Sequence, residues 1–105
     1  MIPAGTAVYE VLAIVARQYG IPIDELPKKG RTQTVARARQ DACALLRDTT
    51  KMSLPEIGRV FDRDHTTIIH GLRSTVNRLK NDPEAAKLFA KMRVEVVDTR
   101  KKATR

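Results

Sequence analysis

The fold of this chain is decided by residues 53–70, which read SLPEIGRVFDRDHTTIIH. Ser53, Pro55 and Glu56 form a helix-start signal. Serine caps helices, proline is tolerated in a first helical turn, and a glutamate three residues after the cap completes a capping box. Apolar residues continue at helical spacing as far as Phe61. The pattern predicts a short, capped helix.

A tight turn and a longer helix follow this short helix. Asp62 and Arg63 form the turn, Asp64 stands where it can cap the next helix, and Gly58 is expected to let a neighbouring backbone come close. The expected buried stripe of the longer helix comprises Ile68, Ile69, Leu72, Val76 and Leu79. A short helix, a tight turn and a second helix with a polar first turn form the helix-turn-helix arrangement, in which the second helix enters the major groove of duplex DNA.

The rest of the chain also carries helical patterns. Thr6 can cap a first helix, and Gly20 is suited to end it. A second long helix is expected from Thr34 to about Asp48, and a last helix from Pro83. No alternating strand pattern occurs. The sequence therefore predicts an all-α fold: one compact domain of about five to six helices with a helix-turn-helix.

The bulk composition fits one globular domain. The chain has 105 residues, of which 42% are hydrophobic and 30% charged. We assign residues 1–97 to the domain and residues 98–105 to a basic, frayed tail. No stretch approaches a membrane span or a secretion signal, so a cytoplasmic, nucleoid-associated location is expected. Cys43 is the only cysteine, and we expect a buried thiol rather than a disulfide.

Positive charge is concentrated after the first quarter of the chain. The formal net charge is +8, yet the first 27 residues are acidic overall, so the excess begins at Lys28. Such asymmetry suits a polyanion that lies across one side of the fold. A membrane surface would also attract positive charge, but that alternative calls for bulky anchors, and only 4% of the residues are aromatic. We therefore expect nucleic acid, and no membrane, as the partner.

The polar first turn of the longer helix has side chains that suit base reading. The Asp64 carboxylate can accept from a cytosine amino group, the Thr66 methyl can pack on a thymine methyl, and the His65 imidazole can contact a base edge. The alternative is an ordinary N-cap and a solvated first turn. His65 and His70 with Cys43 lack the usual zinc-ligand spacing and a fourth ligand, so no metal is expected.

Three motifs in this order resemble the C-terminal box-binding domain of the bacterial replication initiator DnaA. They are VARARQ (residues 35–40), SLPEIG (53–58) and RDHTTIIH (63–70), and the resemblance extends from about Thr6 to Val96. It implies a Trp-repressor-like helix-turn-helix fold. It also implies sequence-specific binding of double-stranded DNA at DnaA-box-like sites, in replication initiation or its regulation.

The resemblance implies roles for individual side chains. Base contacts are expected from Arg31 in the minor groove and, at the major groove, from Pro55, Asp64, His65 and Thr66. Phosphate contacts are expected from Arg39, Gln40, Arg47, Thr50, Leu54, Arg63, Thr67, His70 and Arg73. For the charged helix positions the alternative is a solvated face.

Two departures from the family pattern affect the expected base preference. The family usually has a longer, glycine-containing turn, whereas Phe61 is followed here directly by Asp62 and Arg63. Ser74 stands where a lysine is common, with Arg73 beside it. We therefore expect the fold and DNA binding to transfer better than the sequence that is read.

No signal for catalysis occurs in the chain. There is no glycine-rich phosphate loop ending in Lys-Ser/Thr and no convergent catalytic set, so we expect no bound nucleotide, no cofactor and no enzyme. Three interpretations stay open. The chain is a free-standing DNA-binding protein that marks an origin, regulates transcription at unrelated sites or competes with a host initiator; or it is part of a complete initiator; or it is a protein-binding module on the same scaffold. No heptad seam is present, so a monomer or weak dimer is expected.

Overall fold

The computed structural model describes residues 6–27 and 32–103, and every regular element in these ranges is helical. The elements are α1 (Ala7–Tyr19), the 3-10 turn η1 (Ile23–Glu25), α2 (Gln33–Thr49), α3 (Leu54–Phe61), α4 (His65–Asn81) and α5 (Pro83–Ala103). The prediction of an all-α helix-turn-helix fold is confirmed. Arg31, the predicted minor-groove contact, lies outside the described residues.

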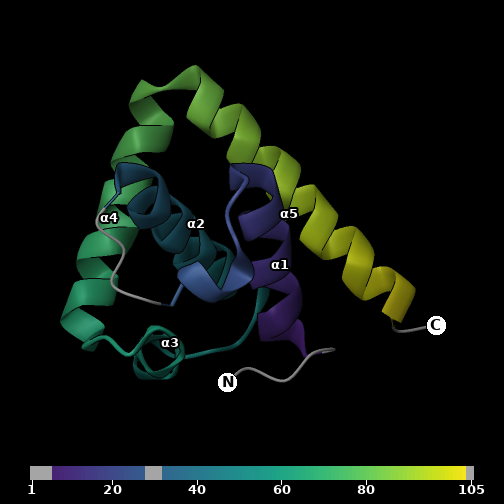
Figure 1. Ribbon diagram of the computed structural model, residues 1–105, viewed down its shortest axis with the longest axis horizontal. Helices are drawn as coiled ribbons and strands as arrows, with labels where there is room; N and C mark the ends of the chain where they lie inside the picture. Colours follow the sequence, from purple (N-terminus) through teal and green to yellow (C-terminus); the bar gives the residue numbers. More distant parts are fainter. Residues whose placement is uncertain (1–5, 28–31, 104–105) are drawn as a thin grey trace.

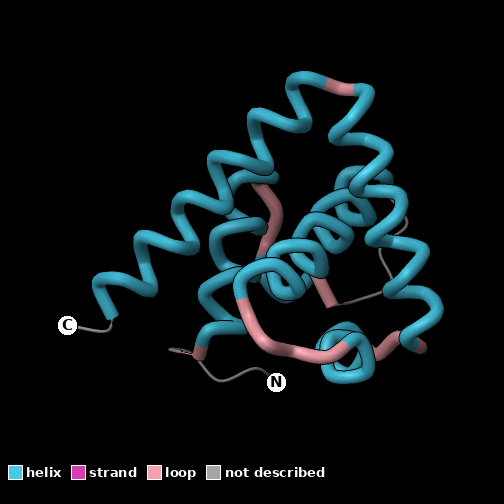
Figure 2. The backbone as a smooth tube through the Cα atoms, turned by 180° about the vertical axis from the view of Figure 1, so that it is seen from behind, coloured by secondary structure: helices cyan, strands magenta, loops and turns pink. Residues whose placement is uncertain are grey.

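Helix α2 is at the centre of the molecule. It contacts α1, α3, α4 and α5, while α4 and α5 meet at one end and diverge like the sides of a wedge (Figure 1). Helix α3 lies at the open end of the wedge, close to the start of α4, where it is seen end-on, and the view from behind shows the same arrangement (Figure 2). The start of α4 is therefore at an end of the molecule rather than within the bundle.

The core is built from the apolar stripes of α1, α2 and α5 with the inner face of α3. Phe61 and Ile57 of α3 have no exposed surface, and Met92 of α5 is equally buried. Each large apolar side chain of this kind contributes about 1.5–3 kcal/mol when it is removed from water. Burial of Ile57 and Phe61 fixes α3 against the bundle, and so fixes the position from which the turn to α4 starts.

The helix ends follow the signals in the sequence. The Thr6 hydroxyl accepts from the backbone N–H of Tyr9, and Gly20 ends α1 in the left-handed conformation with φ 68°. Helix α2 starts one residue before the predicted Thr34, because the Thr32 hydroxyl accepts from the Val35 N–H and caps it. These ends are encoded locally, so the sequence predicts them closely.

The predicted stripe of α4 is wrong at Val76. Val76 is 52% exposed, and Thr75 lies inward instead with 1% of its surface exposed. From Ile68, steps of four, three and four residues lead through Leu72 and Thr75 to Leu79, which is the spacing of one helical face. Val76 is one position off this face, so its side chain reaches the solvent although it is apolar.

Helix α5 continues farther than the sequence predicts. Residues 98–103 were expected to fray, but they extend α5 as far as Ala103. The Arg100 guanidinium donates to the carbonyl of Thr49, the last residue of α2. This contact ties the last turns of α5 to α2 and supplies a partner for an otherwise unpaired helix-end carbonyl. The domain limit at residue 97 stays a prediction.

None of the described helices is both long and apolar enough to span a membrane. Within residues 6–27 and 32–103 there is also no group of three or more histidine, cysteine, aspartate or glutamate side chains that could hold a metal ion.

Candidate nucleic-acid interface

Helix α3 begins with the capping box that the sequence predicts. The Ser53 hydroxyl accepts from the Glu56 N–H at 3.2 Å, and the Glu56 carboxylate accepts from the Ser53 N–H at 2.9 Å. The hydrogen bond that the Ser53 N–H donates to the carboxylate is the largest cause of a lowered pKa at Glu56. The cap therefore contributes stability that is lost as the pH falls through this lowered pKa. The capping box sets where α3 starts, and Pro55 is exposed in its first turn.

The turn between α3 and α4 is short because Asp62 adopts the left-handed conformation. Its φ is 52°, and it is the only non-glycine residue with a positive φ among residues 6–27 and 32–103. The Arg63 N–H donates to the Gly58 carbonyl at 2.8 Å and closes the turn. Aspartate tolerates this conformation better than most side chains do. Asp62 thus allows α3 to connect to α4 through the short turn that the sequence predicts.

Gly58 is the residue that lets this turn pack against α3. A Cβ atom at position 58 would lie 2.5 Å from the Arg63 carbonyl oxygen, which is a backbone atom in the turn. We expect Gly58→Ala to destabilise the fold by about 1–3 kcal/mol, as overpacking does. In a thermal melt this corresponds to a decrease of roughly 4–8 °C per kcal/mol for a domain of this size. Gly71→Ala is the matched control, since its Cβ would meet only the Gln40 Cγ at 3.5 Å. Equal melting temperatures for both variants would contradict the close approach.

Three of the predicted base readers lie together at the start of α4 and point to solvent. The side chains of Asp64 and His65 are 69% and 56% exposed, and Thr66 is also exposed. Asp64 occupies the N-cap position, but its carboxylate makes no capping hydrogen bond and lies 3.1 Å from the His65 Nδ1 instead. The Asp64 side chain therefore does not cap the backbone N–H groups in the first turn of α4. The first turn of α4 presents a carboxylate, an imidazole and a hydroxyl at the end of the molecule.

A groove between α2 and α4 collects five of the predicted phosphate contacts. We call it the α2–α4 groove; its volume is about 190 Å³. The residues of this set that line it are Arg39, Gln40, Arg63, Thr67 and His70. They come from two helices and a turn that are far apart in the sequence, and the fold brings them to one place beside the first turn of α4.

The α2–α4 groove is positively charged. Partial burial, together with the nearby Arg63 guanidinium, lowers the pKa of Arg39 from its ordinary value. The Cys43 thiol also lines the groove, and burial raises its pKa to about 12, so it stays neutral there. Two guanidinium groups facing one groove repel each other, and an anion between them would relieve that repulsion.

Arg63 is held by the end of α3. Its Nη1 donates to the Phe61 carbonyl at 2.7 Å and to the Asp62 carbonyl at 3.3 Å. Both carbonyls are at the helix end, where intrahelical donors are absent. Arg63 thus caps α3 while it lines the α2–α4 groove.

The remaining predicted phosphate contacts do not line this groove. The Arg47 Nη1 donates to the Met52 carbonyl at 3.1 Å, and the Thr50 hydroxyl accepts from the Met52 N–H at 3.1 Å. Both side chains therefore shape the loop between α2 and α3. Leu54 is partly buried against the core, and Arg73 is exposed on α4. Their roles at DNA stay predictions.

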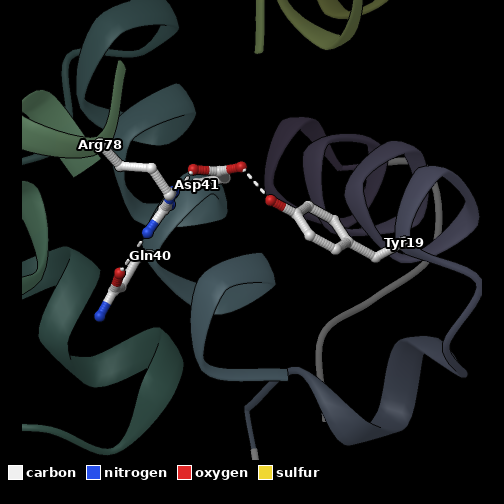
Figure 3. Close-up of polar contacts among 4 residues, drawn as sticks. All are labelled: Tyr19, Gln40, Asp41 and Arg78. Carbon is white, nitrogen blue, oxygen red and sulfur yellow. Dashed lines mark hydrogen bonds and ion pairs between the residues drawn. The ribbon is translucent and has the colours of Figure 1, made fainter. Parts of the chain in front are cut away.

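A buried polar network behind the α2–α4 groove was not predicted (Figure 3). Asp41 of α2 is 2% exposed and pairs with Arg78 of α4, with 2.7 Å between Asp41 Oδ1 and Arg78 Nη2. The Tyr19 hydroxyl donates to the other carboxylate oxygen at 2.5 Å, and Arg78 Nη1 donates to the Gln40 Oε1 at 3.0 Å. Burial and the Asp41 carboxylate raise the pKa of Tyr19, which therefore remains a donor. In the sequence, only Asp41 hints at this network, because it is an aspartate next to Ala42 on the apolar face of α2.

The chain is similar to known proteins over most of its length. Residues 8–74 match the family described as the bacterial dnaA protein helix-turn-helix. The chromosomal replication initiator protein DnaA of Neisseria meningitidis serogroup B is 41% identical over 83 residues, covering 78% of this chain and 16% of the relative. The corresponding protein of Psychromonas ingrahamii is 46% identical over 80 residues, covering 73% of this chain and 18% of the relative.

A solved structure has the same fold. The crystal structure of a DNA replication initiation factor matches with a TM-score of 0.79 and 29% sequence identity, covering 89% of this chain and 29% of that chain. The chain spans only 16–18% of the length of the two curated relatives above. The shared part is the helix-turn-helix region with its supporting helices.

Proposed function

Because the chain belongs to the bacterial DnaA helix-turn-helix family, we propose that it binds double-stranded DNA through α3 and α4. The helix-turn-helix domain of this family is a binding module and not an enzyme, as the sequence predicts. The observation that carries the proposal is the placement of the exposed first turn of α4 beside the basic α2–α4 groove. A base-reading helix end next to phosphate-binding side chains is the arrangement that a helix-turn-helix uses.

In the proposed complex the first turn of α4 enters the major groove. Asp64, His65 and Thr66 contact base edges, and the α2–α4 groove takes a phosphate of the adjoining backbone. Arg31 adds a minor-groove contact, and Pro55 lies near the bases at the start of α3. The preferred duplex resembles a DnaA box. The proposed role is replication initiation or its regulation at the bacterial nucleoid, including competition with a host initiator for its boxes.

Site selection from a random duplex library is the test of this function. We expect enrichment of one asymmetric sequence similar to a DnaA box, bound by one copy of the chain. Titration of the selected duplex and of a scrambled duplex then measures the specificity ratio, which is typically at least 10³ for specific DNA-binding proteins. Enrichment of unrelated sites would indicate a transcriptional regulator. Failure to bind any duplex would favour the protein-binding alternative.

Arg39→Ala is expected to weaken binding to all duplexes by the same factor. A lysine or arginine on a phosphate contributes affinity through counterion release, so its loss reduces the slope of log affinity against log salt by about 0.9. The measurement is a titration of selected and scrambled duplex at several salt concentrations.

Arg93→Ala removes the same charge from α5, where Arg93 pairs with Asp48, and serves as the matched control. We expect it to leave the slope nearly unchanged. A loss for Arg39→Ala that is confined to the selected sequence would contradict the assignment of Arg39 to a phosphate.

A further inference from the structure

The buried network of Tyr19, Asp41 and Arg78 ends at a side chain that lines the α2–α4 groove. The Arg78 guanidinium spans two acceptors on α2, the Asp41 carboxylate at 2.7 Å and the Gln40 amide oxygen at 3.0 Å. The side chains of Asp41 and Arg78 are only 3% and 13% exposed. Gln40 is thus the point at which a rigid, buried ion pair meets the groove (Figure 3).

The contact with Arg78 fixes which end of the Gln40 amide faces the groove. A guanidinium has donors and no acceptor, so only the amide oxygen can face it. The amide nitrogen is then at the opposite end, and it points away from Arg78 (Figure 3). The stem of Gln40 packs over Gly71, where a Cβ would be 3.5 Å from the Gln40 Cγ. Phosphate oxygens are acceptors, so an outward amino group is the orientation that can bind one.

The stability of the fold does not explain why Asp41 and Arg78 form an ion pair at this position. A buried ion pair adds little net stability relative to an apolar pair of similar volume, because both charges lose their hydration. Arg78 also keeps its Nε buried without a hydrogen-bond partner among the described residues, which adds to that cost. A geometric role for the pair would explain why two charges occupy the contact between α2 and α4.

We propose that Asp41 and Arg78 are positioning residues, which hold the Gln40 amide with its amino group facing the α2–α4 groove for a DNA phosphate. The inference rests on the proposed DNA-binding function. Asp41 orients the guanidinium, the guanidinium orients the amide, and neither charged group itself reaches the DNA. The free domain therefore presents this donor already in place, and binding does not have to order it.

The test is a thermodynamic cycle on the complete chain. Asp41→Leu/Arg78→Met removes both members of the pair, leaves the net charge unchanged and replaces them with apolar side chains. Gln40→Ala is made alone and in that double variant. Asp48→Asn/Arg93→Gln is the matched control, since it removes an ion pair between α2 and α5 whose side chains are 46% and 50% exposed. Affinity for the selected and scrambled duplexes is measured at several salt concentrations, with melting temperatures alongside.

The double variant is expected to bind both duplexes about three- to tenfold more weakly, which is the net contribution of one ordinary hydrogen bond. The salt slope should not change, because the amide is neutral and the net charge is the same. Gln40→Ala alone should give a similar loss, and adding it to the double variant should cost less than about twofold more. The control pair should bind within about twofold of the unmodified chain.

Wild-type affinity in the double variant, or losses that multiply when Gln40→Ala is added, would overturn the positioning role while leaving the proposed function intact. Absence of duplex binding by the unmodified chain would overturn both. If the double variant does not fold, Arg78→Lys replaces it in the cycle. A lysine can pair with Asp41 but lacks the planar fork that also reaches Gln40, so the same loss and the same non-additivity are expected.

Discussion

Replacement of Arg78 alone by methionine is expected to lower the free energy of unfolding by about 3–5 kcal/mol. Asp41 is 2% exposed, and Arg78 is its cationic partner at 2.7 Å. Without the guanidinium, a carboxylate remains in the core, and among the described residues only the Tyr19 hydroxyl donates to it. Urea unfolding followed by circular dichroism measures the change, because the midpoint shifts while the slope stays constant in a two-state transition.

The double variant Asp41→Leu/Arg78→Met separates the cost of an unpaired charge from the value of the pair. We expect it to recover most of the stability lost in Arg78→Met, since an apolar pair of similar volume is often neutral or stabilising. A loss below about 1 kcal/mol in the single variant would contradict the burial of Asp41, because exposed ion pairs are worth no more than that. A double variant as unstable as the single one would show that the pair itself supports the fold.

The helix-turn-helix could be predicted because its signals are local. The Ser53–Glu56 capping box uses groups three residues apart, and both of its hydrogen bonds are formed in the structure. The approach of the Arg63 carbonyl to Gly58 also depends on a segment of a few residues. The positions of Asp64, His65 and Thr66 on one exposed turn follow directly from where α4 starts.

The Asp41–Arg78 pair could not be predicted, because its members are 37 residues apart. Periodicity identifies Asp41 as a polar residue on an apolar face, but it does not identify which cation meets it. That depends on how α2 crosses α4. The same crossing turns Thr75 inward and leaves Val76 exposed. Likewise, the composition of residues 98–103 suggests fraying, whereas the contact from Arg100 to the Thr49 carbonyl keeps them helical.

The α2–α4 groove could be predicted in part. Family resemblance suggests a phosphate role for Arg39, Gln40 and His70 one residue at a time, and the fold brings them together. Arg47 and Thr50 carry the same suggestion but bond to the loop between α2 and α3. Residue type does not distinguish the two groups, since an arginine suits either place. The packing of neighbouring helices decides which side chains share a groove.

His65→Ala is expected to cost about 1–3 kcal/mol of binding free energy on the selected duplex, which is the discrimination that one base contact supplies. The imidazole is more than half exposed on the first turn of α4, and its Nδ1 lies 3.1 Å from the Asp64 carboxylate. That contact leaves Nε2 at the outer end of the ring to meet a base edge. Binding to scrambled duplex should hardly change, because non-specific affinity comes from phosphate contacts.

His70→Ala is the matched control, since it removes the same side chain from the α2–α4 groove instead of the exposed first turn. A lost phosphate contact weakens binding to selected and scrambled duplexes alike, so the specificity ratio should fall for His65→Ala and stay constant for His70→Ala. Titrations of both variants on both duplexes at one salt concentration are sufficient. Equal losses for His65→Ala on the two duplexes would place its contact on the backbone, and base reading would then have to come from its neighbours Asp64 and Thr66.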